Sequence, residues 1–251
     1  MIDFNNNSDN NRFDQYEKNQ FGLPVINVTS EEQKVQVADY ITKVYGWMFF
    51  GLALSAVVAY YVSNTPEIIQ YLLKNTMVFW AILIGELILV GALVVRIQKM
   101  SVQTATLLFL FYAALNGLVF APLLLIYTGA SIGTTFAVTA GTFGVMSAYG
   151  YFTKEDLSSF GKIMFMGLIG LIIASIANIF LHSNTLEWIV TFIGIGVFVG
   201  LTAYDTQKIK QYALIPDEEM RKKGAIMGAL ALYLDFVNLF IFLLRIFGRR
   251  N

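Results

Sequence analysis

The sequence predicts an all-α integral membrane protein with seven transmembrane helices, and three observations support this prediction. Apolar runs of about 17 residues or more recur along the chain, and such runs are long enough to cross a bilayer as helices. The composition is 57% hydrophobic and only 14% charged, whereas a soluble domain is usually about 25% charged. Lysine and arginine also concentrate in alternate loops, as the topology of membrane proteins requires.

Short polar segments separate the apolar runs and divide the chain into its predicted parts. The seven spans are expected at residues 44–62, 77–95, 104–127, 132–152, 163–181, 186–204 and 224–247. Residues 1–28 are polar and are predicted to form a disordered tail. Residues 29–43 are predicted to form a short interfacial helix, and residues 44–251 the seven-helix transmembrane domain.

The composition also excludes several kinds of site. The chain has no cysteine, which excludes disulfides, thiolate metal sites and cysteine nucleophiles. Its only histidine, His182, falls in a short loop, so a multi-histidine metal site is impossible. The net charge is zero, and no overall field attracts nucleic acid. We therefore expect no cofactor and no nucleic-acid partner, and the lipid bilayer as the surroundings.

The distribution of lysine and arginine predicts a cytoplasmic N-terminus. With that orientation the cytoplasmic side holds Lys34, Lys43, Arg96, Lys99, Lys154, Lys162, Lys208, Lys210, Arg221, Lys222 and Lys223. The opposite side holds only Lys74 before the last helix. Seven crossings place the C-terminus, with Arg249 and Arg250, on that opposite side. The alternative is a re-entrant segment at residues 236–247, which would return the C-terminus to the cytoplasm.

The last apolar run carries Asp235 near its middle. An ionised carboxylate inside the membrane costs about 2.5–3.5 kcal/mol even on insertion scales, so it needs a partner, a proton or water. Asp235 shares a helical face with Gly224 and Gly228, because offsets of 7 and 11 residues return to nearly the same angle. Asn238 and Arg245 lie on an adjacent face. The alternative to a functional acid is a structural carboxylate satisfied by Arg245 or by a hydroxyl.

A second acid, Asp205, follows the preceding apolar run, and our central hypothesis is that it meets Asp235. Two carboxylates within hydrogen-bonding distance cannot both ionise cheaply, so they share a proton. Asp235 would lie about 16 Å along a helix that begins at Gly224. The pair therefore requires the last helix to begin in water, and Pro216 followed by three acids is a plausible start. Alone, Asp205 could equally be a solvated residue beside Lys208.

Glu86 is the third acid within a predicted span. It could be a neutral acid held by a polar group such as Asn116, or an oxygen ligand along a cation pathway. Carboxylate and carbonyl oxygens suit hard cations such as calcium, and the spans contain no lysine to favour an anion. Calcium is thus the expected transported ion, although protons or sodium fit almost as well, and no bound metal site is assigned.

Several stretches resemble the Bax inhibitor-1 family of membrane proteins. They are residues 199–208 around Asp205, residues 232–240 around Asp235 with Arg245, residues 139–151, and residues 45–48. The resemblance implies two three-helix layers around a central C-terminal helix. It also implies a pH-sensitive calcium leak gated by Asp205 and Asp235. Glu86 and Arg245 would line or latch the pathway. We also predict Asn238 and Asn116, polar residues within the spans, as residues of this pathway or latch.

The leading functional hypothesis is therefore a pH-sensitive calcium leak channel of the bacterial inner membrane, with calcium ions and protons as partners. One alternative is a regulatory protein that acts on other membrane proteins. A less favoured alternative is an intramembrane aspartyl protease, because Asp235 lacks the flanking Gly-x-Gly of those enzymes. Our expectation is that the protein is not an enzyme.

Overall fold

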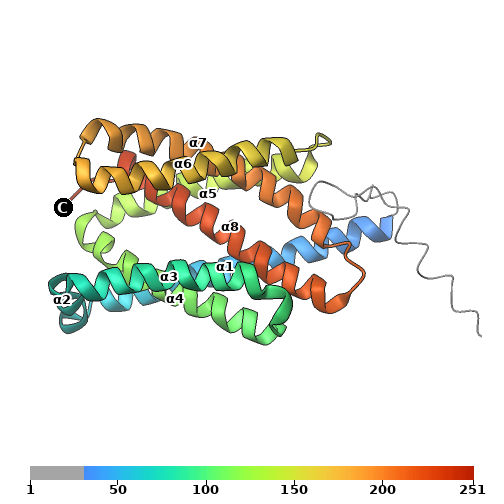
Figure 1. Cartoon of the computed structure of the whole chain (residues 1–251), viewed down its shortest axis with the longest axis horizontal. Helices are drawn as coiled ribbons and strands as arrows, with labels where there is room; N and C mark the ends of the chain where they lie inside the picture. The colour runs from blue at the N-terminus through green and yellow to red at the C-terminus, as the bar shows by residue number, and fades with distance from the viewer. Residues whose placement is uncertain (1–30) are drawn as a thin grey trace, which may run out of the picture.

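A long central helix, α8 (Glu218–Phe247), runs between two groups of helices (Figure 1). The structure is a computed structural model and describes residues 31–251, so the predicted tail at residues 1–28 lies outside the described residues. Helix α8 contacts α7 and α5 on one side and α1 and α4 on the other. It has the largest buried share of the candidate spans, which is why its apolar run tolerates polar side chains.

Three long helices form each layer. The first layer contains α1 (Glu31–Ser63), α3 (Thr76–Arg96) and α4 (Val102–Ile126), and the second contains α5 (Gly129–Phe152), α6 (Ser158–Leu181) and α7 (Asn184–Tyr212). Helix α4 packs on both α1 and α3, and α7 packs on both α5 and α6. This is the arrangement that the family resemblance implies, with the last helix at the centre.

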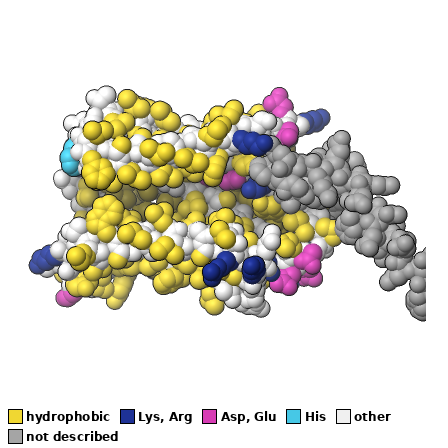
Figure 2. Space-filling view, in the orientation of Figure 1, with side chains coloured by type: hydrophobic (Ala, Val, Ile, Leu, Met, Phe, Trp, Pro, Cys, Tyr) yellow, Lys and Arg dark blue, Asp and Glu magenta, His cyan; other side chains and the backbone are white. Residues whose placement is uncertain are grey.

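The helices have the length and the surface of a membrane-spanning bundle. Six of those described between residues 31 and 251, all of the long ones except α5, are long and apolar enough to cross a bilayer. Large hydrophobic side chains such as Leu87, Val95 and Phe180 are exposed, and charged side chains gather towards the two ends (Figure 2). The fold class of an all-α integral membrane protein is confirmed, whereas the count of seven spans stays a prediction because α5 is not among the six.

The boundaries of α7 and α8 differ from the predicted ones. Helix α7 continues to Tyr212, whereas the predicted span ended at residue 204, and only residues 213–217 connect it to α8. Asp217 caps α8, because its Oδ1 accepts a hydrogen bond of 2.6 Å from the amide of Met220. Segments rich in polar and charged residues therefore extend both helices beyond their apolar runs. The hydropathy of the spans alone could not indicate these extensions.

The C-terminal residues pack against the turn between α4 and α5. The amide of Thr128 donates to the carbonyl of Arg249 at 2.9 Å, and the amide of Asn251 donates to the carbonyl of Ile126 at 2.9 Å. Helix α8 is continuous as far as Phe247. The re-entrant alternative for residues 236–247 is therefore wrong, because the backbone hydrogen bonds of α8 continue without a reversal.

Two further elements differ from the sequence interpretation. Helix α1 is continuous from Glu31, so the predicted interfacial helix and the first span are one helix. A short helix, α2 (Pro66–Lys74), lies between the first two predicted spans, in a stretch for which no helix was predicted. It is too short to span a bilayer, but Pro66 occupies its first turn, and Ile69 and Leu72 are buried three residues apart.

The glycines of α5 and α7 differ in how closely other helices approach them. In α5, a Cβ atom added at Gly141 or Gly144 would have no neighbour within 4 Å, whereas Gly150 lies against the backbone of Ala203 in α7. In α7, Gly196 is equally open, and Gly200 packs against Met164 of α6. Glycine spacing therefore identifies candidates for close approach, and the neighbouring helices determine which of them are used.

Candidate functional site

Asp205 and Asp235 meet where α7 and α8 pack against each other. The two helices run in opposite directions: Gly224 of α8 lies beside Tyr212, and Gly228 lies beside Ile209. A Cβ atom at Gly228 would come within 2.8 Å of Ile209 Cγ1, so only glycine allows this approach. About two turns further along this face, the carboxyl group of Asp235 comes within hydrogen-bonding reach of Asp205.

The pair is an unusual electrostatic arrangement. Asp235 is 3% exposed, and its Oδ2 atom is buried without a hydrogen-bond partner among the described residues. Lys208, one turn after Asp205, is the cation that acts on that carboxyl group. Its Nζ atom also lies 5.8 Å from the ring centre of Tyr204. A single lysine cannot neutralise two carboxylates, so contact between them requires a shared proton or another cation.

Asp235 does not form the bond to Arg245 that would have made it a purely structural carboxylate. Arg245 lies ten residues later, about 15 Å along the helix, and its guanidinium stacks over the ring of Phe242 at 5.5 Å. The amide of Asn238 is also occupied, since its Nδ2 donates to the carbonyl of Leu234 at 2.8 Å. The structure therefore brings Asp205 to Asp235 but neither Arg245 nor Asn238.

Glu86 lies in a second buried polar cluster, on the opposite side of α8. It is 7% exposed, its Oε1 atom has no partner among the described residues, and Tyr112 and Tyr233 are its electrostatic neighbours. Asn116 does not satisfy this oxygen, since its Nδ2 is directed to the carbonyl of Tyr112 at 3.4 Å. The hydroxyl of Tyr233 meets Ser55 Oγ at 2.7 Å.

These two acidic sites are connected by α8. Tyr233 and Asp235 are two residues apart, and successive helical residues are separated by about 100°. Their side chains therefore leave the helix in nearly opposite directions, Tyr233 towards the α1–α4 layer and Asp235 towards α7. Any shift of α8 consequently changes both sites together.

The sequence interpretation missed the polar face of α5. Thr135, Thr139 and Ser147 are all buried on this helix, and the hydroxyls of Thr135 and Ser147 have no hydrogen-bond partner in the described chain. Thr135 and Thr139 are four residues apart and share one face of the helix, and Ser147 lies about 120° round from Thr135. The sequence signal that could have revealed these buried residues was the recurrence of hydroxyl side chains within a glycine-rich span.

An aromatic cluster also lies beside the aspartates and was not predicted. The ring of Phe236, the residue after Asp235, is 5.4 Å from the rings of Phe136 and Phe143. Tyr45 contacts Phe143, and its hydroxyl lies 3.2 Å from that of Thr206 on α7. The cluster joins α1, α5 and α8 next to the carboxyl pair.

The acids do not form a conventional metal centre. Within residues 31–251, no three aspartate, glutamate or histidine side chains gather closely enough to hold an ion together. The buried acids are instead a contacting pair on one side of α8 and a single glutamate on the other.

Comparison with known proteins identifies the family to which this chain belongs. The sequence profile described as "Inhibitor of apoptosis-promoting Bax1" matches residues 37–251. The chain is 50% identical over 215 residues to the inner membrane protein YbhL of Escherichia coli, which covers 84% of this chain and 92% of that protein. It is 42% identical to an uncharacterized protein of Borreliella burgdorferi, over 90% of this chain and 99% of the relative. An uncharacterized membrane protein of Streptococcus pyogenes is 35% identical, over 88% and 96% of the two chains. The chain therefore belongs to the Bax inhibitor-1 family of membrane proteins.

Proposed function

We propose that this protein is a passive, proton-regulated cation conductance of the bacterial inner membrane, with calcium as the transported ion. The observation that carries the proposal is the contact between Asp205 and Asp235 inside the α7–α8 interface. A buried pair of acids with an unpartnered oxygen is costly as a purely structural feature, and acids within a membrane commonly mark ion or proton pathways.

The pair regulates the conductance through its charge. With one proton shared, the two carboxyl groups attract each other and hold α8 against α7. When that proton is lost, two negative charges are in contact and repel each other, and either the helices separate or a cation enters. The neighbours on α7 that interact electrostatically with Asp205 during this step are Lys208 and Tyr204.

The rest of the pathway follows the polar groups beside α8. Glu86 offers a second carboxylate on the α3–α4 side, and the hydroxyls of Thr135 and Ser147 offer oxygen ligands on the α5 side. Oxygen ligands suit hard cations. Phe236 and Phe143 close the space next to the aspartates, and movement of α8 would displace the first of these rings.

Calcium flux into liposomes tests this function directly. We expect purified protein to carry calcium into liposomes loaded with a calcium-sensitive dye, faster as the pH rises across about 5 to 8, because the second carboxyl group ionises. Liposomes without protein provide the background rate. Equal protein-dependent flux at acid and alkaline pH would contradict the proposal.

The proposed orientation places the N-terminus in the cytoplasm and the C-terminus outside. The chain has no cysteine, so single cysteines can report the side of each loop. In intact cells, a membrane-impermeant maleimide should label Asn184→Cys and Asn251→Cys but not Lys154→Cys, and inverted vesicles should give the reverse pattern. All three positions are exposed. Labelling of Lys154→Cys in intact cells would reverse the orientation.

A further inference from the structure

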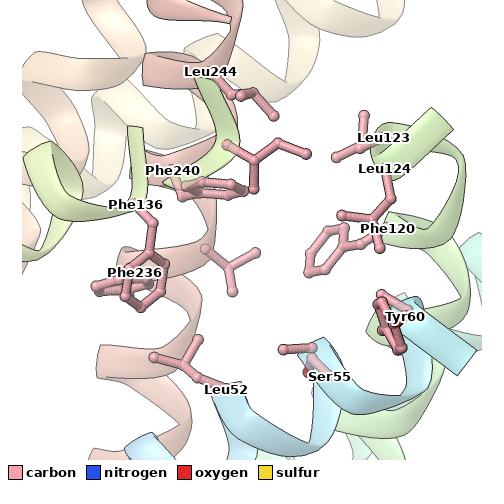
Figure 3. Close-up of a pocket in the computed structure, with 14 residues that line it drawn as sticks. Leu52, Ser55, Tyr60, Phe120, Leu123, Leu124, Phe136, Phe236, Phe240 and Leu244 are labelled. Carbon is pink, nitrogen blue, oxygen red and sulfur yellow. The ribbon is translucent and has the colours of Figure 1, made fainter. Parts of the chain in front are cut away.

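A cavity of about 370 Å³ lies between the two layers of helices. Figure 3 shows open space between Phe236 and Phe240 on α8 and Phe120, Leu123 and Leu124 on α4. Phe136 of α5 and residues of α1 complete the wall. Its walls therefore come from four helices: α1 and α4 of one layer, α5 of the other, and the central α8.

The wall of the cavity is almost entirely apolar. Its polar side chains are those of Ser55 and Tyr60. The hydroxyl of Ser55 is already bonded to the carbonyl of Ala113 at 2.6 Å and to Tyr233 at 2.7 Å. Tyr60 is 68% exposed. A water molecule in such a space would lack the two to four polar partners it needs, and an ion would lack ligands.

The cavity opens towards the lipid-facing surface of the bundle. Tyr60 and Phe136, which line it, are 68% and 47% exposed, and Ala56 is exposed beside them. In a membrane this surface meets hydrocarbon. A volume of 370 Å³ holds about a dozen methylene-sized groups if each takes about 30 Å³, as a water molecule does in the liquid.

Two positively charged residues follow the part of α8 that lines the cavity. Leu244 lines the cavity, and Arg249 and Arg250 follow it after little more than one turn. The carbonyl of Arg249 is held by the amide of Thr128, at the start of the helix that supplies Phe136. Both arginines are exposed. A lipid whose acyl chain enters the cavity from this end thus places its headgroup beside two cations.

We propose that the cavity binds one acyl chain of an anionic phospholipid, with the phosphate of its headgroup beside Arg249 and Arg250. The apolar wall excludes the headgroup from the cavity, and the arginines favour a negative charge at its end. This inference depends on the membrane fold and is independent of the proposed conductance. The bound chain would support α8 on the side that faces away from α7.

Photocrosslinking can locate the acyl chain. Protein in phosphatidylcholine nanodiscs receives a small share of phosphatidylglycerol that carries a diazirine in the middle of one acyl chain. We expect labelling of Phe120 and Phe240 on the cavity wall, mapped by mass spectrometry. Labelling of exposed Ile173 on α6 serves as the standard for ordinary contact with bilayer lipid.

Filling the cavity should abolish the wall labelling. Ala56→Trp reaches into it from α1, and Leu124→Trp reaches into it from α4. Val57→Trp is the matched control, because Val57 is 65% exposed and does not line the cavity. Wall labelling that persists in both filled variants, or wild-type labelling confined to surfaces such as that of Ile173, would overturn the acyl-chain site.

The headgroup contact has its own test. In the wild type, photoactivatable phosphatidylglycerol should label the wall more strongly than the corresponding phosphatidylcholine. The double variant Arg249→Gln, Arg250→Gln should lose this preference while the wall remains labelled by both lipids. Equal labelling by the two lipids in the wild type would refute the role of the arginines.

Discussion

Replacement of both Asp205 and Asp235 by asparagine is expected to remove most of the pH dependence of calcium flux. Asparagine has nearly the same shape as aspartic acid but carries no titratable charge, and its amide can donate to its neighbour across the α7–α8 interface. The packing should therefore persist while the shared proton is eliminated. Flux into dye-loaded liposomes, measured at several values across about pH 5 to 8, should then vary much less with pH than flux through the wild type.

Asp156→Asn is the matched control for this experiment. Asp156 lies outside the spans, and hydrogen bonds from the hydroxyl and amide of Ser158 hold the pKa of its carboxyl group below its ordinary value. It is therefore ionised throughout the tested range, and its loss should leave the pH response unchanged. If the double aspartate variant retained the wild-type pH response, the carboxyl pair would not be the sensor.

Gly150→Ala is expected to cause the largest loss of stability among single small substitutions. A Cβ atom at this position would overlap the carbonyl oxygen of Ala203 in α7, and a backbone atom cannot rotate away as a side chain can. Helices α5 and α7 must then separate. Overpacking of this kind costs about 1–3 kcal/mol and occasionally more, which outweighs the roughly 1 kcal/mol that alanine gains over glycine in helix propensity.

The matched control is Gly144→Ala in the same helix, where an added Cβ has no neighbour within 4 Å. Thermal unfolding in detergent should show a lower midpoint for Gly150→Ala and little change, or a small increase, for Gly144→Ala. Ala203 precedes Asp205 by two residues, so we also expect the flux of the first variant to lose its normal pH response. Equal midpoints for the two variants would contradict the close contact between α5 and α7.

The fold class and the contact of the two aspartates could be predicted because they depend on strong local signals. A carboxylate within a long apolar run can be stabilised in hydrocarbon in only a few ways, such as by a partner or a proton. A second acid at the end of the preceding run is the nearest candidate partner. The helical face shared by Gly224, Gly228 and Asp235 was also evident from their spacing, and both glycines lie against neighbouring helices. The roles of these residues in conduction stay predictions.

The boundaries of the helices and the remaining polar contacts could not be predicted in the same way. Hydropathy marks only the segment that crosses hydrocarbon, so it missed the last two turns of α7 and the whole of α2. Asn116 and Arg245 were plausible partners for acids because their side chains are polar. Their actual contacts, with the carbonyl of Tyr112 and the ring of Phe242, are decided by tertiary packing.

The position of α8 has a consequence for the biosynthesis of the protein. The chain is made from its N-terminus, so both outer layers leave the ribosome before the segment that packs between them. Until the thirty residues of α8, Glu218–Phe247, are inserted, neither layer can bury its inner surface. Assembly of the bundle therefore waits for α8, and a nascent chain interrupted before this helix would expose the inner surfaces of both layers to lipid and to cellular quality control.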